Sequence, residues 1–134
     1  MSVEHLNPDS LFKLDGFTQI CVPPAGKRLA FVAGQTALDT KFELGATAFH
    51  DQVVLAFRNV AHALDAIGAG TADVVGMTFY IVGLSDAKFQ EFVKAMNVAL
   101  DGKPFPPNAS SVIGVERLAL GGLEIEMSAV VAVD

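Results

Sequence analysis

The sequence has few of the residues that would suit it to bind nucleic acid or to form disulfides. Only nine of its 134 residues are Lys or Arg, they are scattered singly, and the formal net charge is −6. Binding to a phosphate backbone needs clustered cations, so we expect no nucleic-acid partner. Cys21 is the only cysteine, which excludes an internal disulfide and fits a reducing cytoplasm.

Long apolar runs are also missing. No run reaches the roughly 20 residues that a membrane span requires. The first ten residues, MSVEHLNPDS, contain acidic residues instead of a basic segment followed by an apolar one. We therefore expect a cytoplasmic protein with no signal peptide and no membrane partner.

The motifs that hold metals, phosphates or reactive thiols are absent as well. His5, His50 and His62 lie far apart, which predicts no metal site. Neither GxGxxG nor GxxxxGK[ST] occurs, so no nucleotide cofactor is expected. Cys21 has no histidine near it in sequence, and we interpret it as a small apolar filler of a strand.

Hydrophobic residues, in contrast, are plentiful. They make up 51% of the chain, and the mean hydropathy is +0.45. Two interpretations stay open at this point: a domain that is simply rich in Ala and Val, or one that buries apolar surface against copies of itself.

Periodicity predicts one α+β domain, residues 1–134, with the order β-β-α-β-α-β-β. The first 15 residues look irregular, and strand character follows at 17–22, 28–33, 74–82, 111–118 and 123–133. One apolar stripe predicts a helix that ends at Gly68. A second helix is predicted to begin after the capping residue Ser85 and to end by Gly102, with Phe89 and Phe92 on its inner face. Both helices should cover one face of a mixed sheet.

The last strand suggests a contact between subunits. Its alternation places Leu123, Ile125 and Met127 on one face, while Val130 and Ala132 make the other face apolar too. A strand that is apolar on both faces in a two-layer domain implies a subunit contact.

Glu124 and Glu126 flank Ile125 and should point to one face of that strand. They are either solvated there, or one of them lies at the mouth of a cleft, where it could orient water or transfer a proton.

Several segments, in order, resemble the RidA/YjgF family of imine and enamine deaminases. They are GFTQI (residues 16–20), FVAGQTALD (31–39), the helix NVAHALDAIGAG with the strand ADVVGMTFYIVGLSD, and VERLALGGLEIEMSAVVA. The resemblance spans about residues 14–133. It implies a chorismate-mutase-like fold assembled as a homotrimer, with small-molecule clefts between subunits.

The resemblance also implies roles for particular residues. In deaminating members an arginine grips the substrate carboxylate, and water attacks the C=N carbon with help from a glutamate and from backbone groups near the G-Q turn. The glutamate maps onto Glu124, the glycine onto Gly34 and the family's tyrosine onto Phe17.

The arginine, however, does not map. Counting back from Leu118 places it at Ser110, and counting forward from Pro107 places it at Ala109. The cysteine or threonine that follows it in the family becomes Val112. Loss of such a charged donor typically costs about 1.5–3 kcal/mol of binding. Deamination of 2-iminoacids by the usual route is therefore not expected, whereas Ser110 and Asn108 are neutral donors that suit a less charged ligand.

Two hypotheses of function follow. The first is a hydrolase of the deaminase type that acts on a small imine or enamine, with Glu124 positioning water. The second is a non-catalytic trimer that binds a small metabolite or another protein. A third activity, the endoribonuclease label attached to this family, conflicts with the charge of −6.

Overall fold

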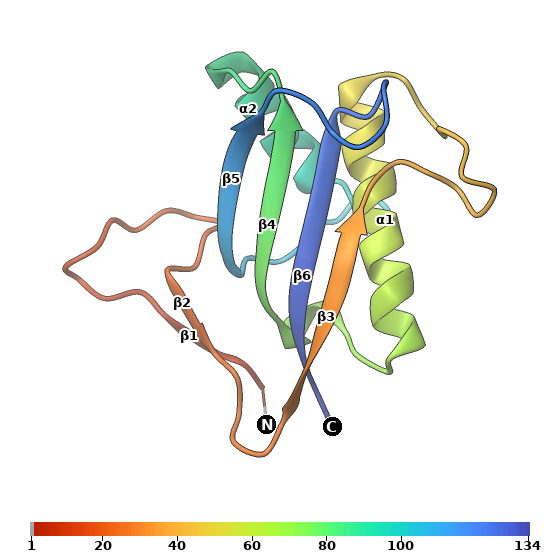
Figure 1. The fold of residues 1–134 in the computed structure, drawn as a ribbon. Helices are drawn as coiled ribbons and strands as arrows, with labels where there is room; N and C mark the ends of the chain where they lie inside the picture. Colours follow the sequence, from red (N-terminus) through yellow and green to blue (C-terminus); the bar gives the residue numbers. More distant parts are fainter. Residues whose placement is uncertain (1) are drawn as a thin grey trace.

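The computed structural model describes residues 2–134, which form a four-stranded mixed sheet with two helices behind it (Figure 1). The elements are β1 (Glu4–Leu6), β2 (Ile20–Val22), β3 (Arg28–Gln35), α1 (Phe49–Ala66), a short 3-10 helix (Thr71–Asp73), β4 (Val74–Val82), α2 (Asp86–Met96), β5 (Ala109–Val115) and β6 (Ile125–Val133).

The strand order in the main sheet is β3-β6-β4-β5. β4 and β5 run parallel, and β6 is antiparallel to both β3 and β4. β1 and β2 form a separate antiparallel ribbon beside the sheet, which joins it through an isolated bridge between Thr18 and Ala109 (Figure 1). The predicted α+β class, the mixed sheet and the placement of both helices on one face are confirmed.

The core lies between the helices and the sheet. Alternate residues of β4 and β6 face α1 and α2, and an aromatic cluster fills the middle, with ring centroids of Phe57 and Phe105 4.9 Å apart. The buried residues of the two central strands that belong to this core are Val74, Met77, Phe79, Ile81, Ile125, Met127, Ala129 and Val131. The period-2 pattern of the sequence therefore fixed which strand face meets the helices.

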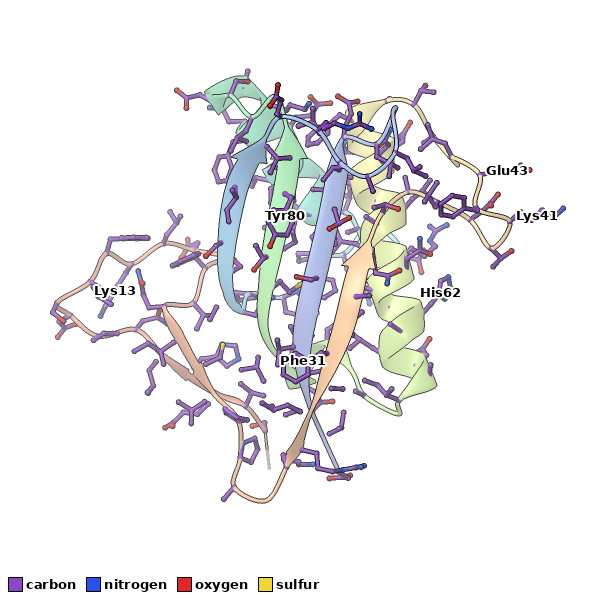
Figure 2. The ribbon with its side chains drawn as sticks, in the orientation of Figure 1. Lys13, Phe31, Lys41, Glu43, His62 and Tyr80 are labelled. Atoms are coloured by element: carbon purple, nitrogen blue, oxygen red, sulfur yellow. The ribbon has the colours of Figure 1, made fainter. Side chains whose placement is uncertain are left out.

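Within residues 2–134 no helix covers the opposite face of the sheet, although Ala132 of β6 is buried there. Phe31 of β3 is 76% exposed there, with Leu29 and Ile113 also exposed, and Figure 2 shows Phe31 and Tyr80 on this open face. Exposed apolar groups gathered on one sheet face are typical of an interface with another molecule.

Some local predictions need correction. Residues 4–6 are a strand, not irregular chain, because they pair with residues 20–22, and so the strand predicted at 17–22 is shorter. β5 ends at Val115 and β6 begins only at Ile125. The buried stripe of α2 holds only Phe92 and Ala95, and Phe89 is 40% exposed with its ring centroid 6.4 Å from that of Phe92.

Helix ends follow the predicted chemistry. The Ser85 hydroxyl oxygen accepts a hydrogen bond from the Lys88 backbone N–H at 3.1 Å and caps α2. Gly68 follows α1 with φ +67°, a conformation that ends a helix and favours glycine. Within residues 2–134 no helix is long and apolar enough to span a bilayer.

Candidate functional site

Glu124 immediately precedes β6, at the end of the sheet near the start of both helices. Strand register places it opposite Val82, whose backbone N–H donates to the Glu124 carbonyl at 3.0 Å. The Glu124 backbone N–H in turn donates to the buried amide oxygen of Gln52 on α1, at 2.9 Å. The backbone of Glu124 is therefore fixed from both sides.

The Glu124 carboxylate is held by a lysine. Lys88 Nζ lies 2.9 Å from Glu124 Oε1, and the two side chains are 18% and 34% exposed respectively. The same ammonium donates to the Val82 carbonyl and lies 4.8 Å from the centroid of the Phe49 ring. An ammonium has three donors, and two of them are used by the Val82 carbonyl and Glu124. Glu124 keeps Oε2 for another partner.

The position of Lys88 in its helix is a signal that sequence reasoning did not use. It lies in the first turn of α2, where the helix dipole disfavours a cation. A lysine at that position indicates a compensating partner, but the partner is 36 positions away and only the fold identifies it.

Gly34 lies next to the other glutamate of the pair. A Cβ on Gly34 would stand 2.5 Å from Cδ of Glu126, so the absence of a side chain makes room for that carboxylate. The register between β3 and β6 also shifts between Val32 and Gln35, which is a local irregularity of the ladder at Gly34. The two glutamates predicted on one strand face therefore have different neighbours.

Ser110 and Val112 lie on β5 and face the helices. Their register partners on β4 are Met77 and Phe79, both buried in the core. Neighbouring residues in a sheet share a face, so the position expected for the family's arginine carries a short neutral side chain on the helix side of an outer strand.

Phe17 and Asn108 lie at the same end of the sheet as Ser110. Phe17 and Pro107 line a hollow of about 480 Å³ beside β5, and Thr18 forms a bridge with Ala109. Asn108 is buried, and among residues 2–134 its Oδ1 has no hydrogen-bond donor. A buried acceptor without a donor is costly, so it is a candidate contact for a group from outside the chain.

The candidate residues thus form two groups in one chain. Glu124 lies opposite Val82, whereas Ser110 pairs with Met77, five residues earlier on β4. At about 3.3 Å per residue, this separates them by about 16 Å along the strands. Glu124 lies at one end, Gly34 lies further along β6 beside Glu126, and Phe17, Asn108 and Ser110 lie together toward the other end.

Sequence reasoning missed a contact of Cys21. Pairing of β1 with β2 puts His5 opposite Cys21, with Sγ 3.8 Å from His5 Nδ1, which is also 3.0 Å from the Thr18 hydroxyl. Burial raises the pKa of the Cys21 thiol, and a hydrogen bond with the Ala109 backbone lowers it by less. The thiol is therefore not activated, in agreement with a mainly structural cysteine. No group of three or more His, Cys, Asp or Glu in residues 2–134 could hold a metal ion.

This geometry defines a class: a small α+β domain with an open sheet face and two clusters of polar residues at opposite ends of the sheet. The sequence pattern of the family described as Endoribonuclease L-PSP matches residues 15–133. The chain belongs to this family, which its solved relatives call Rid or YjgF.

Solved structures agree in fold over nearly the whole chain. A Yersinia pestis protein of unknown function from the conserved Rid family, YyfB, is 30% identical, covers 99% of this chain and 100% of its own, and has a TM-score of 0.87. A Mycobacterium tuberculosis member of the YjgF family is 27% identical over 89% of this chain and 88% of its own, with a TM-score of 0.61. Escherichia coli TdcF with bound serine is 22% identical over 91% of each chain, with a TM-score of 0.67, and shares the fold. No curated protein gives a significant match.

Proposed function

We propose that the protein is a homotrimer that hydrolyses a small imine or enamine in clefts between its subunits, with Glu124 positioning the attacking water. The observation that carries this proposal is the carboxylate of Glu124, which is two-thirds buried and fixed at Oε1 by Lys88, while its Oε2 accepts no hydrogen bond within residues 2–134. A preorganised carboxylate of this kind can accept a proton from water.

The separation of the two residue groups supports a cleft made by two copies. Glu124 and Ser110 are too far apart in one chain to contact one small molecule. A site that uses both takes Gly34 and Glu124 from one copy and Phe17, Asn108, Ser110 and Val112 from the next. The open, apolar sheet face supplies surface for such an assembly.

The proposed reaction needs only water. Water adds to the carbon of the C=N bond, and its proton passes through Glu124 to the nitrogen. The resulting carbinolamine then loses ammonia and leaves a carbonyl compound. An enamine enters the same route after a proton moves to its β-carbon. Lys88 acts through Glu124, because it holds that carboxylate in place while another of its donors is used by the Val82 carbonyl.

The proposed ligand is neutral or weakly charged near Ser110. Asn108 and Ser110 replace a guanidinium with an amide and a hydroxyl, which cannot form an ion pair. Serine is bound in the TdcF structure, and its carboxylate would meet no cation at Ser110 in this cleft. RNA cleavage is not proposed, since the net charge of −6 opposes a polyanion.

Ammonia release tests the proposal. Small imines and enamines generated in situ are offered to the protein, and Glu124→Gln should lower any hydrolysis about 10²-fold or more. Glu91→Gln, on the exposed face of α2, is the matched control and should change nothing. Little ammonia is expected from 2-aminoacrylate, because Ser110 cannot hold its carboxylate. Equal turnover by wild type and Glu124→Gln would contradict the proposal.

A second candidate is a trimer that binds a metabolite without turning it over. The Lys88–Glu124 ion pair favours it, because the pair fixes the carboxylate as a ready hydrogen-bond acceptor for a bound ligand. In that case purified protein should carry a small molecule detectable by mass spectrometry. Glu124→Gln would then change affinity, with no ammonia released by either protein.

A further inference from the structure

An exposed phenylalanine stands at the tip of the turn between β3 and α1. Phe42 is 69% exposed and has φ +64°. A bulky residue in the left-handed region is a genuine outlier, and its backbone is strained. The tip, defined here as residues 39–44, therefore keeps an apolar ring in water at a conformational cost.

Hydrogen bonds hold this tip in one conformation. Asp39 Oδ1 accepts from the backbone N–H groups of Lys41 and Glu43 at 2.9 and 3.0 Å, and the Asp39 carbonyl accepts from Phe42 at 3.0 Å. A bridge between Leu38 and Leu44 closes the base. A preorganised apolar anchor loses little entropy when it binds.

The hollow beside β5 has a complementary character. It measures about 480 Å³, and Leu14, Phe17 and Pro107 give it apolar lining. Lys13, which pairs with Asp9 at 2.6 Å, and Asp15 also line it, whereas Phe42 is flanked by Lys41 and Glu43. Each part thus combines apolar side chains with a cation and an anion, and Lys13 would exchange Asp9 for the incoming Glu43.

Tip and hollow lie on opposite sides of the molecule. The tip follows β3, one outer strand of the sheet, and the hollow lies beside β5, the other outer strand. Figure 1 shows the loops carrying them on opposite sides, and Figure 2 shows Lys41 and Glu43 on one side and Lys13 on the other. One chain cannot fill its own hollow, but a head-to-tail ring of copies repeats this contact at every interface.

We infer that Phe42 of one copy inserts into the hollow of the neighbouring copy, with Lys41 beside Asp15 and Glu43 beside Lys13. This inference rests on the proposed assembly, and it makes Phe42 a wall of the ligand cleft next to Phe17. The strain at Phe42 is then offset by burial of its ring in the interface.

Phe42→Gly tests the contact. Glycine adopts the positive φ without strain, so the variant should fold at least as well as the wild type. Loss of a central aromatic anchor should weaken association about 30-fold or more. Phe89→Ala removes another exposed phenylalanine, on the outer helix layer, and should leave association unchanged. Dissociation is followed by light scattering on dilution.

Two further measurements identify the partner surface. Glu43→Lys should weaken association, and adding Lys13→Glu should restore it. In a Cys21→Ser background, chains with Phe42→Cys are mixed with chains with Leu14→Cys and oxidised, and a disulfide should form between them. Chains with His62→Cys in place of Leu14→Cys are the control and should form no disulfide with Phe42→Cys. If the wild type is a trimer, the Phe42→Gly variant is also a trimer and no cross-link forms, the inference is wrong but the proposed trimer stands. A monomeric wild type overturns both.

Discussion

Replacing Lys88 with methionine should destabilise the fold measurably. Methionine keeps most of the side-chain length and the apolar stem but removes the ammonium. Its three contacts, with Glu124, the Val82 carbonyl and the Phe49 ring, are all lost. A hydrogen bond from a charged group contributes about 1.5–3 kcal/mol, and a cation–π contact about 0.5–1 kcal/mol.

Solvent exposure reduces this sum. The Glu124 side chain is 34% exposed, so water partly screens its charge and can solvate it once Lys88 is gone. We therefore expect Lys88→Met to lower the free energy of unfolding by about 2 kcal/mol. Lys94→Met, on the same helix but exposed, should cost less than about 0.5 kcal/mol.

Urea unfolding at one protein concentration measures both variants, because assembly makes apparent stability depend on concentration. A double-mutant cycle with Glu124→Gln isolates the coupling between the two side chains, expected at about 1 kcal/mol. Equal losses for Lys88→Met and Lys94→Met, or zero coupling, would refute the claim that Lys88 fixes Glu124.

Three other outcomes are expected. Gly76→Ala places a Cβ 2.8 Å from the Ala109 carbonyl oxygen, so it should push β5 away and lower the free energy of unfolding in urea by about 1–3 kcal/mol. The Cβ of Gly121→Ala contacts no other atom, so this control should lower the free energy of unfolding far less. Gly34→Ala forces the Glu126 side chain to move and should lower the free energy of unfolding. Adding Glu126→Ala should restore most of this loss, and no restoration would show that the clash lies elsewhere. Cys21 should react with iodoacetamide more slowly than a free thiol at pH 8, because its raised pKa lowers the thiolate fraction, and its rate should still be rising at higher pH where a free thiol has levelled off.

Sequence patterns determined much of the local structure. The apolar stripe of α1, the Ser85 cap and the strand Val74–Val82 depend on neighbours within a few residues, so spacing alone predicts them. Strand alternation also predicted which side of β6 is buried. The missing cation at Ser110 is visible in the sequence itself, because a neutral side chain cannot become charged by folding.

Other features depend on contacts between distant segments. The strand character of residues 4–6 depends on pairing with residues 20–22, since an isolated three-residue segment has no preference of its own that could fix it. The same pairing brings His5 to Cys21, 16 positions away.

The candidate site divides in the same way. The sequence by itself determined that Glu124 is a carboxylate next to the last strand and that the family's arginine is absent. Only the tertiary structure decided that Lys88 neutralises Glu124, that Glu126 occupies the space at Gly34, and that Ser110 lies about 16 Å further along the sheet. The physical reason is that strand register and helix docking set these distances, and both arise from long-range packing that local sequence does not encode.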